Sequence, residues 1–318
     1  HLSLRRQRQM CIRDRYERMF TEAMDSAEQH LWKNVTVVPH APSLSVVVSS
    51  MGHGRSHVSL EHLACFSGGM MALGSRIVPD RRHYLNIARM TTETCYWGYN
   101  SSLTGLGAEA LEFYHPQDKD MYRVVTEADG TRHRGPPVGD PFVGVRYIWH
   151  EDYRNRPEVI ESVLYMWRTT GDPVWQERGW QMFASWMTHC LTRSGTSTIY
   201  DVNAVPVRHS DSMESFVLAE TFKYYYLLFS PPDLVSLDDF VFSTEAHPFL
   251  LPRAGRWARA GDVPASFPRI DRRFPAILRP RGQGTPMQRG LWEAQRQASG
   301  KTARLREVLW LSLIHISE

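Results

Sequence analysis

The sequence has few cysteines, no long apolar run and no short metal-binding motif. Its four cysteines include no CxxC pair, which argues against a structural zinc site. No apolar stretch reaches the roughly 18 residues that a membrane-spanning helix needs. No signal peptide is visible, and the chain does not begin with methionine. What remains, with 42% hydrophobic and 22% charged residues, is typical of a globular protein that can bury a sizeable core.

Basic residues are concentrated near the C-terminus. Residues 251–310 carry twelve arginines and one lysine against four acidic residues, whereas the whole chain has a net charge of only +3. These basic residues are scattered among Pro, Gly and Ala without helix-face spacing. We therefore interpret residues 250–318 as a disordered or artefactual tail, and we do not expect nucleic acid as a partner.

The two ends of the chain also look foreign to the rest. Residues 10–15 and 311–318 resemble translated sequencing-adaptor sequence. We expect residues 1–15 to be an adaptor-derived artefact, so that the folded domain spans residues 16–249.

The body of the chain predicts helices joined by loops. The apolar spacing favours helices at 16–33, 57–74 with a C-cap near Gly74, 82–100, from Pro157 to Gly171, from Asp172-Pro173 to about 190, and from Asp211 or Ser212 to 229. Strand signals occur only at 36–38, 44–49 and 199–202, and a hairpin is expected around Asp129-Gly130. This order predicts a mainly helical fold, either a helical array or an α/α barrel.

The first motif with chemical content is residues 156–162, Arg-Pro-Glu-Val-Ile-Glu-Ser. Glu158 and Glu161 are three residues apart and therefore share one helix face. Glu158 lies in the first turn, where the helix dipole favours the ionised form that suits a general base. An acidic first turn without any catalytic role has the same spacing, so the pattern alone leaves both interpretations open.

Two further motifs follow. Glu220 falls within a mostly apolar helix, where burial of a carboxylate is costly unless a cation, hydrogen bonds or a metal compensates. An ion pair with a neighbouring Arg or Lys is the alternative. Residues 243–248 contain Thr244, whose hydroxyl and carbonyl are hard oxygen ligands of the kind that Ca²⁺ takes, although the same residues are typical of a simple turn.

Residues 156–162, 213–229 and 243–248, in this order, resemble glycoside hydrolase family 47, the class I α-mannosidases. Residues 62–69, 92–97 and 167–172 also match this family, and the resemblance covers about residues 16–249. The family fold is a barrel of seven helix hairpins with calcium at the base of a cleft. The resemblance therefore implies a mainly α structure that forms part of an α/α barrel with a few short strands.

The resemblance also implies residue roles. Glu158 matches the general base that activates water, and Thr244 matches the threonine that ligates calcium. The residues that match those binding the terminal mannose or the calcium-bound waters are Arg156, Glu161, Phe216, Glu220, Glu245 and His62. Cys65 and Cys95 match a family disulfide, which is typical of an oxidising lumen, and Cys190 matches a buried thiol.

The implied activity is Ca²⁺-dependent, inverting hydrolysis of terminal α-1,2-linked mannose from high-mannose N-glycans, in the lumen of the Golgi or endoplasmic reticulum. The family's acid and an Arg-Gly-Asp-Ser-Tyr-Tyr motif precede the part that this chain resembles. We therefore expect an incomplete, inactive piece of an enzyme that could carry a membrane anchor upstream. The alternatives are recognition of mannose glycans without hydrolysis, in glycoprotein degradation, and an inert helical scaffold.

Overall fold

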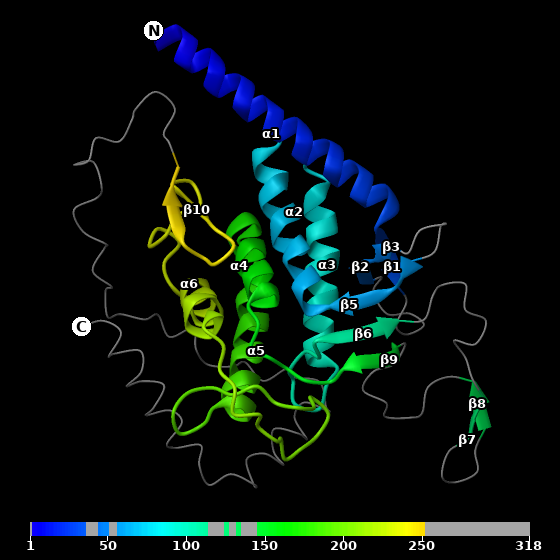
Figure 1. The fold of residues 1–318 in the computed structure, drawn as a ribbon. Helices are drawn as coiled ribbons and strands as arrows, with labels where there is room; N and C mark the ends of the chain where they lie inside the picture. The colour runs from blue at the N-terminus through cyan, green and yellow to red at the C-terminus, as the bar shows by residue number, and fades with distance from the viewer. Residues whose placement is uncertain are drawn as a thin grey trace. The chain divides into compact units, whose positions relative to one another are not determined.

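The computed structural model describes residues 2–35, 44–50, 56–113, 124–126, 132–134 and 145–251, all of which belong to one compact unit, residues 1–263. Its α-helices are α1 (Leu2–His30), α2 (Phe66–Ile77), α3 (Tyr84–Asn100), α4 (Glu158–Thr170), α5 (Val174–Cys190) and α6 (Lys223–Phe229) (Figure 1). A 3₁₀ turn, η1 (His62–Cys65), precedes α2, and a π-helical turn, η3 (Val217–Phe222), precedes α6. The predicted mainly helical class is confirmed.

The strands are short and antiparallel. The two-stranded pairs are β1 (Trp32–Val35) with β2 (Leu44–Val47), β3 (Ser49–Ser50) with β4 (Ser56–His57), β7 (Val124–Thr126) with β8 (Arg132–Arg134), and β10 (Phe240–Phe242) with β11 (Pro248–Leu250). A three-stranded sheet has the order β5 (Ser59–Glu61), β6 (Ala110–Phe113), β9 (Val145–His150). The pairing of β7 with β8 on either side of Asp129-Gly130 agrees with the predicted hairpin.

Local sequence signals set the ends of α4 and the start of α5. Pro157 lies immediately before α4, and Gly171 ends this helix in the left-handed conformation with φ of 68°. The Asp172 carboxylate accepts a hydrogen bond from the backbone N–H of Val174 at 3.1 Å, at the start of α5. These predicted boundaries are confirmed to within a residue or two.

Other boundaries were wrong. The expected helix 57–74 is not helical at its start: most of that part forms β4, β5 and η1, because residues 59–61 pair with 110–112. The helix that follows, α2, continues past Gly74 and ends at Ile77. The last helix begins at Val217 instead of near residue 211. Of residues 199–202, only Ile199 forms β-bridges, and these are isolated, so the expected strand is not formed there. The expected strand at 36–38 lies outside the described residues.

Helix α1 is longer than the predicted 16–33 helix at its N-terminal end. It runs without interruption through residues 2–15, the segment expected to be foreign. The foreign origin of residues 1–15 stays a prediction. Among the helices that the structure describes, none combines the length and the apolar character needed to cross a membrane.

Helix α4 lies at the centre of the helical packing. It contacts α2, α3, α5 and α6, and Figure 1 shows it between the α2–α3 pair and α6. All residues from Val159 to Met166 are buried, as expected for a helix that other helices surround. The Ser162 hydroxyl donates to the carbonyl of Cys65 at 2.6 Å and accepts from the N–H of Gly69 at 2.9 Å. This contact fixes α4 against η1 and α2, where the site residues lie.

Candidate active site

Glu158, the first residue of α4, meets His62, the first residue of η1. Oε2 of Glu158 lies 2.9 Å from Nδ1 of His62, and the two side chains are 13% and 2% exposed, respectively. Burial raises the pKa of Glu158, but the hydrogen bond and charge of His62, the N–H of Glu158 itself and the charge of Arg156 outweigh burial. The pKa of Glu158 is therefore below its usual value, and the carboxylate is ionised at neutral pH.

Tyr99 completes a hydrogen-bonded chain behind Glu158. Its hydroxyl oxygen lies 2.7 Å from Nε2 of His62, and the residue is buried on α3. Nδ1–H of His62 can donate to the carboxylate, while the hydroxyl of Tyr99 can either donate to Nε2 or accept from it, so both contacts can be satisfied. Burial raises the pKa of Tyr99, which keeps the hydroxyl a donor. The sequence reasoning missed Tyr99, whose only signal is its position four residues after Cys95 on the same helix face.

Glu161 lies almost one turn further along α4 and is 6% exposed. The hydroxyl of Tyr224, on α6, donates to its Oε1 at 2.6 Å. Burial raises the pKa of Glu161 to about 8, and the charges of Glu220 and Glu158 contribute to the rise, while the Tyr224 hydrogen bond opposes it. Glu161 is consequently protonated at neutral pH unless a cation compensates its charge.

Glu220 lies on η3 and is influenced by the charges of two other acidic groups. Burial raises its pKa, and so do the negative charges of Glu158 and Glu245, whereas the Lys223 ammonium lowers it. Glu220 is therefore within electrostatic reach of both the start of α4 and the turn between β10 and β11. The sequence predicted these residues separately, and the fold brings them together.

Thr244 and Glu245 are exposed in the turn between β10 and β11. The ammonium of Lys223 donates to the carbonyl of Ala246 at 2.9 Å, which ties this turn to α6. The N–H of Ser243 donates to the carbonyl of His247 at 2.9 Å and closes the turn. The turn thus carries Thr244 directly before Glu245, whose charge acts on Glu220. We refer to Glu158, Glu161, Glu220 and Glu245, which influence one another electrostatically, as the acidic cluster.

Arg156 and Phe216 flank this cluster. The guanidinium of Arg156 lies 5.8 Å from the centroid of the Phe216 ring, a cation–π contact. Nε of Arg156 also donates to Oε2 of Glu109 at 2.6 Å, and the Glu109 side chain is 9% exposed. Glu109 had not been predicted, because no motif connects it with Arg156. Its carboxylate holds the arginine two residues before Glu158.

The disulfide implied by the resemblance, Cys65–Cys95, is present, with its Cα atoms 6.0 Å apart. It joins the end of η1 to α3 and so connects the element that carries His62 with the helix that carries Tyr99. Cys190 is a free, buried thiol, as expected.

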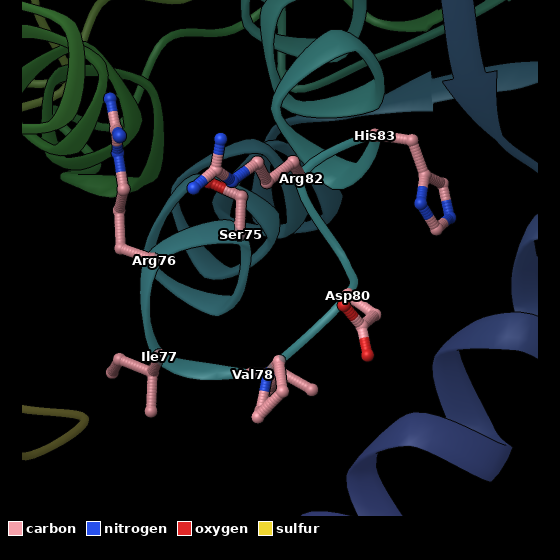
Figure 2. A pocket seen from close by; sticks show the side chains of 8 residues that line it. Ser75, Arg76, Ile77, Val78, Asp80, Arg82 and His83 are labelled. Atoms are coloured by element: carbon pink, nitrogen blue, oxygen red, sulfur yellow. The ribbon is translucent and has the colours of Figure 1, made fainter.

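The turn between α2 and α3 forms a separate hollow of about 640 Å³, lined in part by Arg76, Asp80, Arg82 and His83 (Figure 2). Figure 2 shows Arg76 pointing away from the turn, and its guanidinium donates to the carbonyl of Thr169 at the end of α4. None of the predicted site residues lines this hollow.

Near that turn, Asp25, Glu28 and His83 place possible metal-ligand atoms within 4.8 Å of one another, and all three are exposed. Both carboxylate oxygens of Asp25 already accept hydrogen bonds, from Arg81 at 3.1 and 2.8 Å and from Tyr84 at 2.6 Å. A metal ion at this group would compete with these contacts.

The model of glycosyl hydrolase family 47 matches residues 4–251, most of the chain. The chain belongs to glycosyl hydrolase family 47. It is 38% identical over 232 residues to mannosyl-oligosaccharide 1,2-alpha-mannosidase IC of Homo sapiens, covering 72% of this chain and 32% of that protein. It is 34% identical over 234 residues to mannosyl-oligosaccharide 1,2-alpha-mannosidase IA of Sus scrofa, covering 73% of this chain and 31% of that protein.

A solved structure of the family, the alpha-1,2-mannosidase from Trichoderma reesei, is similar with a TM-score of 0.62 at 28% identity. The similarity covers 74% of this chain and 47% of that one. This family 47 chain thus spans about a third of the length of the curated relatives that it matches. The similarity confirms the predicted fold class, a mainly helical part of the family's α/α barrel.

Proposed function

We propose that the protein to which this chain belongs hydrolyses terminal α-1,2-linked mannose from high-mannose N-glycans with inversion, and that it depends on calcium. The observation that carries the proposal is the ionised, nearly buried Glu158, held by His62 beside a cluster of acidic residues. An ionised carboxylate with a fixed orientation suits the activation of a water molecule.

In this reaction Glu158 would act as the general base. His62 holds the carboxylate in one orientation through Nδ1, and Tyr99 holds His62 through Nε2. Inversion requires a second carboxyl group that protonates the leaving oxygen from the other side of the sugar. None of the residues assigned here takes that role, so this chain accounts for the water-activating half of the reaction.

The donor set of the acidic cluster fits a calcium ion. Thr244 offers a hydroxyl and a carbonyl, and Glu161, Glu220 and Glu245 offer carboxylates, all of them the hard oxygen ligands that Ca²⁺ prefers. The raised pKa values of Glu161 and Glu220 reflect burial and mutual repulsion that a divalent cation would relieve. When bound, the ion would supply the positive charge that orients sugar hydroxyls and water.

The remaining predicted site residues would bind the sugar. The Phe216 ring, backed by Arg156, offers an apolar surface for the C–H face of a terminal mannose. The disulfide between Cys65 and Cys95 supports a location in the lumen of the secretory pathway, in the Golgi or endoplasmic reticulum, because such compartments are oxidising. The names of these relatives, mannosyl-oligosaccharide 1,2-alpha-mannosidases, support the substrate class.

The test is mannose release from a high-mannose oligosaccharide by the complete gene product. We expect Glu158→Gln to lower kcat by about 10²- to 10⁴-fold, because it removes the proton acceptor. Glu22→Gln is the control, since that side chain is 72% exposed on α1. Chelation of calcium should abolish the activity, and addition of calcium should restore it. Full activity of the Glu158→Gln enzyme would refute the base assignment, and binding of the glycan without any release would favour a recognition role.

A further inference from the structure

The chain contains two Asn-x-Ser/Thr triplets, the acceptor pattern for N-linked glycans, at residues 34–36 and 100–102. Such a triplet also arises by chance, so its asparagine must lie where the fold can accommodate a bulky group. Thr36 lies outside the described residues, whereas residues 100–102 are described in full. The triplet Asn100-Ser101-Ser102 is therefore the one whose surroundings are known.

Asn100 is the last residue of α3 and is exposed. Cys95 and Tyr99, four residues apart on one face of this helix, face inward and are each 2% exposed. Consecutive residues of an α-helix point about 100° apart, so Asn100 leaves the helix in a different direction from Tyr99. A glycan on Asn100 would extend from the surface and would not disturb the contact between Tyr99 and His62.

The turn that follows α3 explains part of the triplet without a glycan. The hydroxyl of Ser102 donates to the carbonyl of Tyr99 at 3.1 Å and accepts from the N–H of Leu106 at 2.9 Å. Ser102 could therefore be present only to stabilise the helix end. However, glycan transfer takes place on a chain that has not yet folded, in which this hydroxyl is still available for recognition. The contacts of Ser102 in the folded state are thus compatible with both roles.

The residues after the triplet are held at the surface. The N–H of Leu103 donates to Oδ1 of Asn203 at 3.2 Å, and the N–H of Thr104 donates to the carbonyl of Val202 at 3.1 Å. Asn100 therefore lies at a fixed helix end, where an added group meets solvent instead of a core that would have to open.

The disulfide between Cys65 and Cys95 is a second, independent feature of the same helix. Cys95 precedes Asn100 by five residues on α3, and disulfides form and persist in oxidising compartments such as the endoplasmic reticulum lumen. N-linked glycans are attached in that same lumen. A chain that has formed this disulfide there has also passed the enzyme that modifies such triplets.

We propose that Asn100 carries an N-linked glycan. The donor is an oligosaccharide joined to a lipid through pyrophosphate, and a luminal transferase catalyses the step. Nδ2 of Asn100 attacks the anomeric carbon of the first sugar, so that an N–C bond forms while the C–O bond to the pyrophosphate breaks. The lipid pyrophosphate leaves, and one amide proton passes to a base of the transferase. The inference rests on the luminal location in the proposed function, but not on the mannosidase activity.

The experiment uses the complete gene product, expressed in eukaryotic cells. Peptide N-glycosidase in water enriched in heavy oxygen converts each glycosylated asparagine to a labelled aspartate, which mass spectrometry locates in the sequence. We expect the label at position 100 in most copies. Asn100→Gln should lose this label and migrate faster on a gel by the mass of one glycan, with kcat unchanged because the residue lies outside the candidate active site.

Two neighbouring serines provide a matched control. Ser101 and Ser102 are 9% and 8% exposed, and the same change to alanine removes one hydroxyl from each, but only Ser102 belongs to the acceptor pattern. We expect Ser101→Ala to keep the glycan and Ser102→Ala to lose it, whereas Ser102→Thr should keep it.

An unlabelled Asn100 in wild-type protein that has formed the Cys65–Cys95 disulfide would overturn the proposal, and Ser102 would then serve only the helix end. Equal labelling of Ser101→Ala and Ser102→Ala would overturn it as well. Mannose release by an enzyme without a glycan at Asn100 would refute this site and leave the proposed function intact. A glycosylated Asn100 in a protein that releases no mannose would support the site and count against the proposed function.

Discussion

The buried carboxyl of Glu161 should make the stability of this protein depend on pH. Its pKa is raised from 4.5 to about 8, chiefly by burial. The folded state therefore binds more protons than the unfolded state between these two values, so stability is fully present below about pH 4.5 and falls until about pH 8. A difference of about 3.5 pKa units corresponds to a loss on the order of 5 kcal/mol.

Glu161→Gln isolates this effect. The amide carbonyl can still accept the hydrogen bond from Tyr224, but the side chain no longer titrates. Urea unfolding of both proteins at pH 5 and pH 9, with a chelator present, gives four free energies of unfolding. We expect the wild-type protein to lose several kcal/mol more than the variant between the two pH values. The comparison cancels the titration of histidines and other groups that the two proteins share.

An equal loss of stability in both proteins would refute the reasoning, because it would show that Glu161 ionises in the folded state as easily as in the unfolded one. The proposed calcium site adds a second expectation. A cation beside Glu161 favours its ionised form, so calcium should raise the melting temperature of the wild-type protein more at pH 8 than at pH 6. Equal shifts at the two pH values would separate Glu161 from the calcium site.

Three further predictions concern the scaffold. Tyr99→Phe removes the hydrogen bond to the buried Nε2 of His62 and should lower the free energy of unfolding in urea by about 1–3 kcal/mol. In the complete enzyme it should change kcat more than KM. Unchanged values would contradict the chain of contacts. Cys95→Ser removes a disulfide with a sequence separation of 30 and should lower the free energy of unfolding by about 3–4 kcal/mol. The same urea assay, under oxidising conditions, measures this. No difference would show that the bond adds no stability. Gly105→Ala should cost more than Gly171→Ala in thermal melts. Both glycines have φ near +70°, but a Cβ at Gly105 would lie 2.3 Å from the Ser185 hydroxyl, whereas nothing lies within 4 Å at Gly171; equal costs would mean that the site relaxes freely.

Much of the candidate site was predictable because its signals are local. Pro157, Gly171 and Asp172 mark helix ends by their own backbone and capping chemistry, and the structure has the helices there. The three-residue spacing puts Glu158 and Glu161 on one face of any helix that contains them. The family resemblance then assigned separate motifs to one site, which their spacing in the sequence alone could not do.

The failed boundaries have a common cause. Residues 59–61 carry apolar spacing that also suits a helix, but they pair with β6, about fifty residues away, and become a strand. The hydrogen-bonded chain of Tyr99, His62 and Glu158 also depends on contacts between distant residues, because His62 is 37 residues from Tyr99 and 96 residues from Glu158 in sequence. No pattern within a window of ordinary helix or strand length carries such information.

The sequence by itself determined the helical class, the ends of α4, the start of α5 and the identity of the acidic and threonine groups, since these follow from backbone preferences and side-chain chemistry. The first-turn position of Glu158 already favoured its ionised form, but the tertiary structure alone decided that Glu161, on the same helix face, is protonated at neutral pH in the absence of a cation. The physical reason is that a pKa depends on burial and on neighbours from other elements. Here Glu158 meets His62 at the start of α4, whereas Glu161 is buried where α4 contacts α6, near other carboxylates.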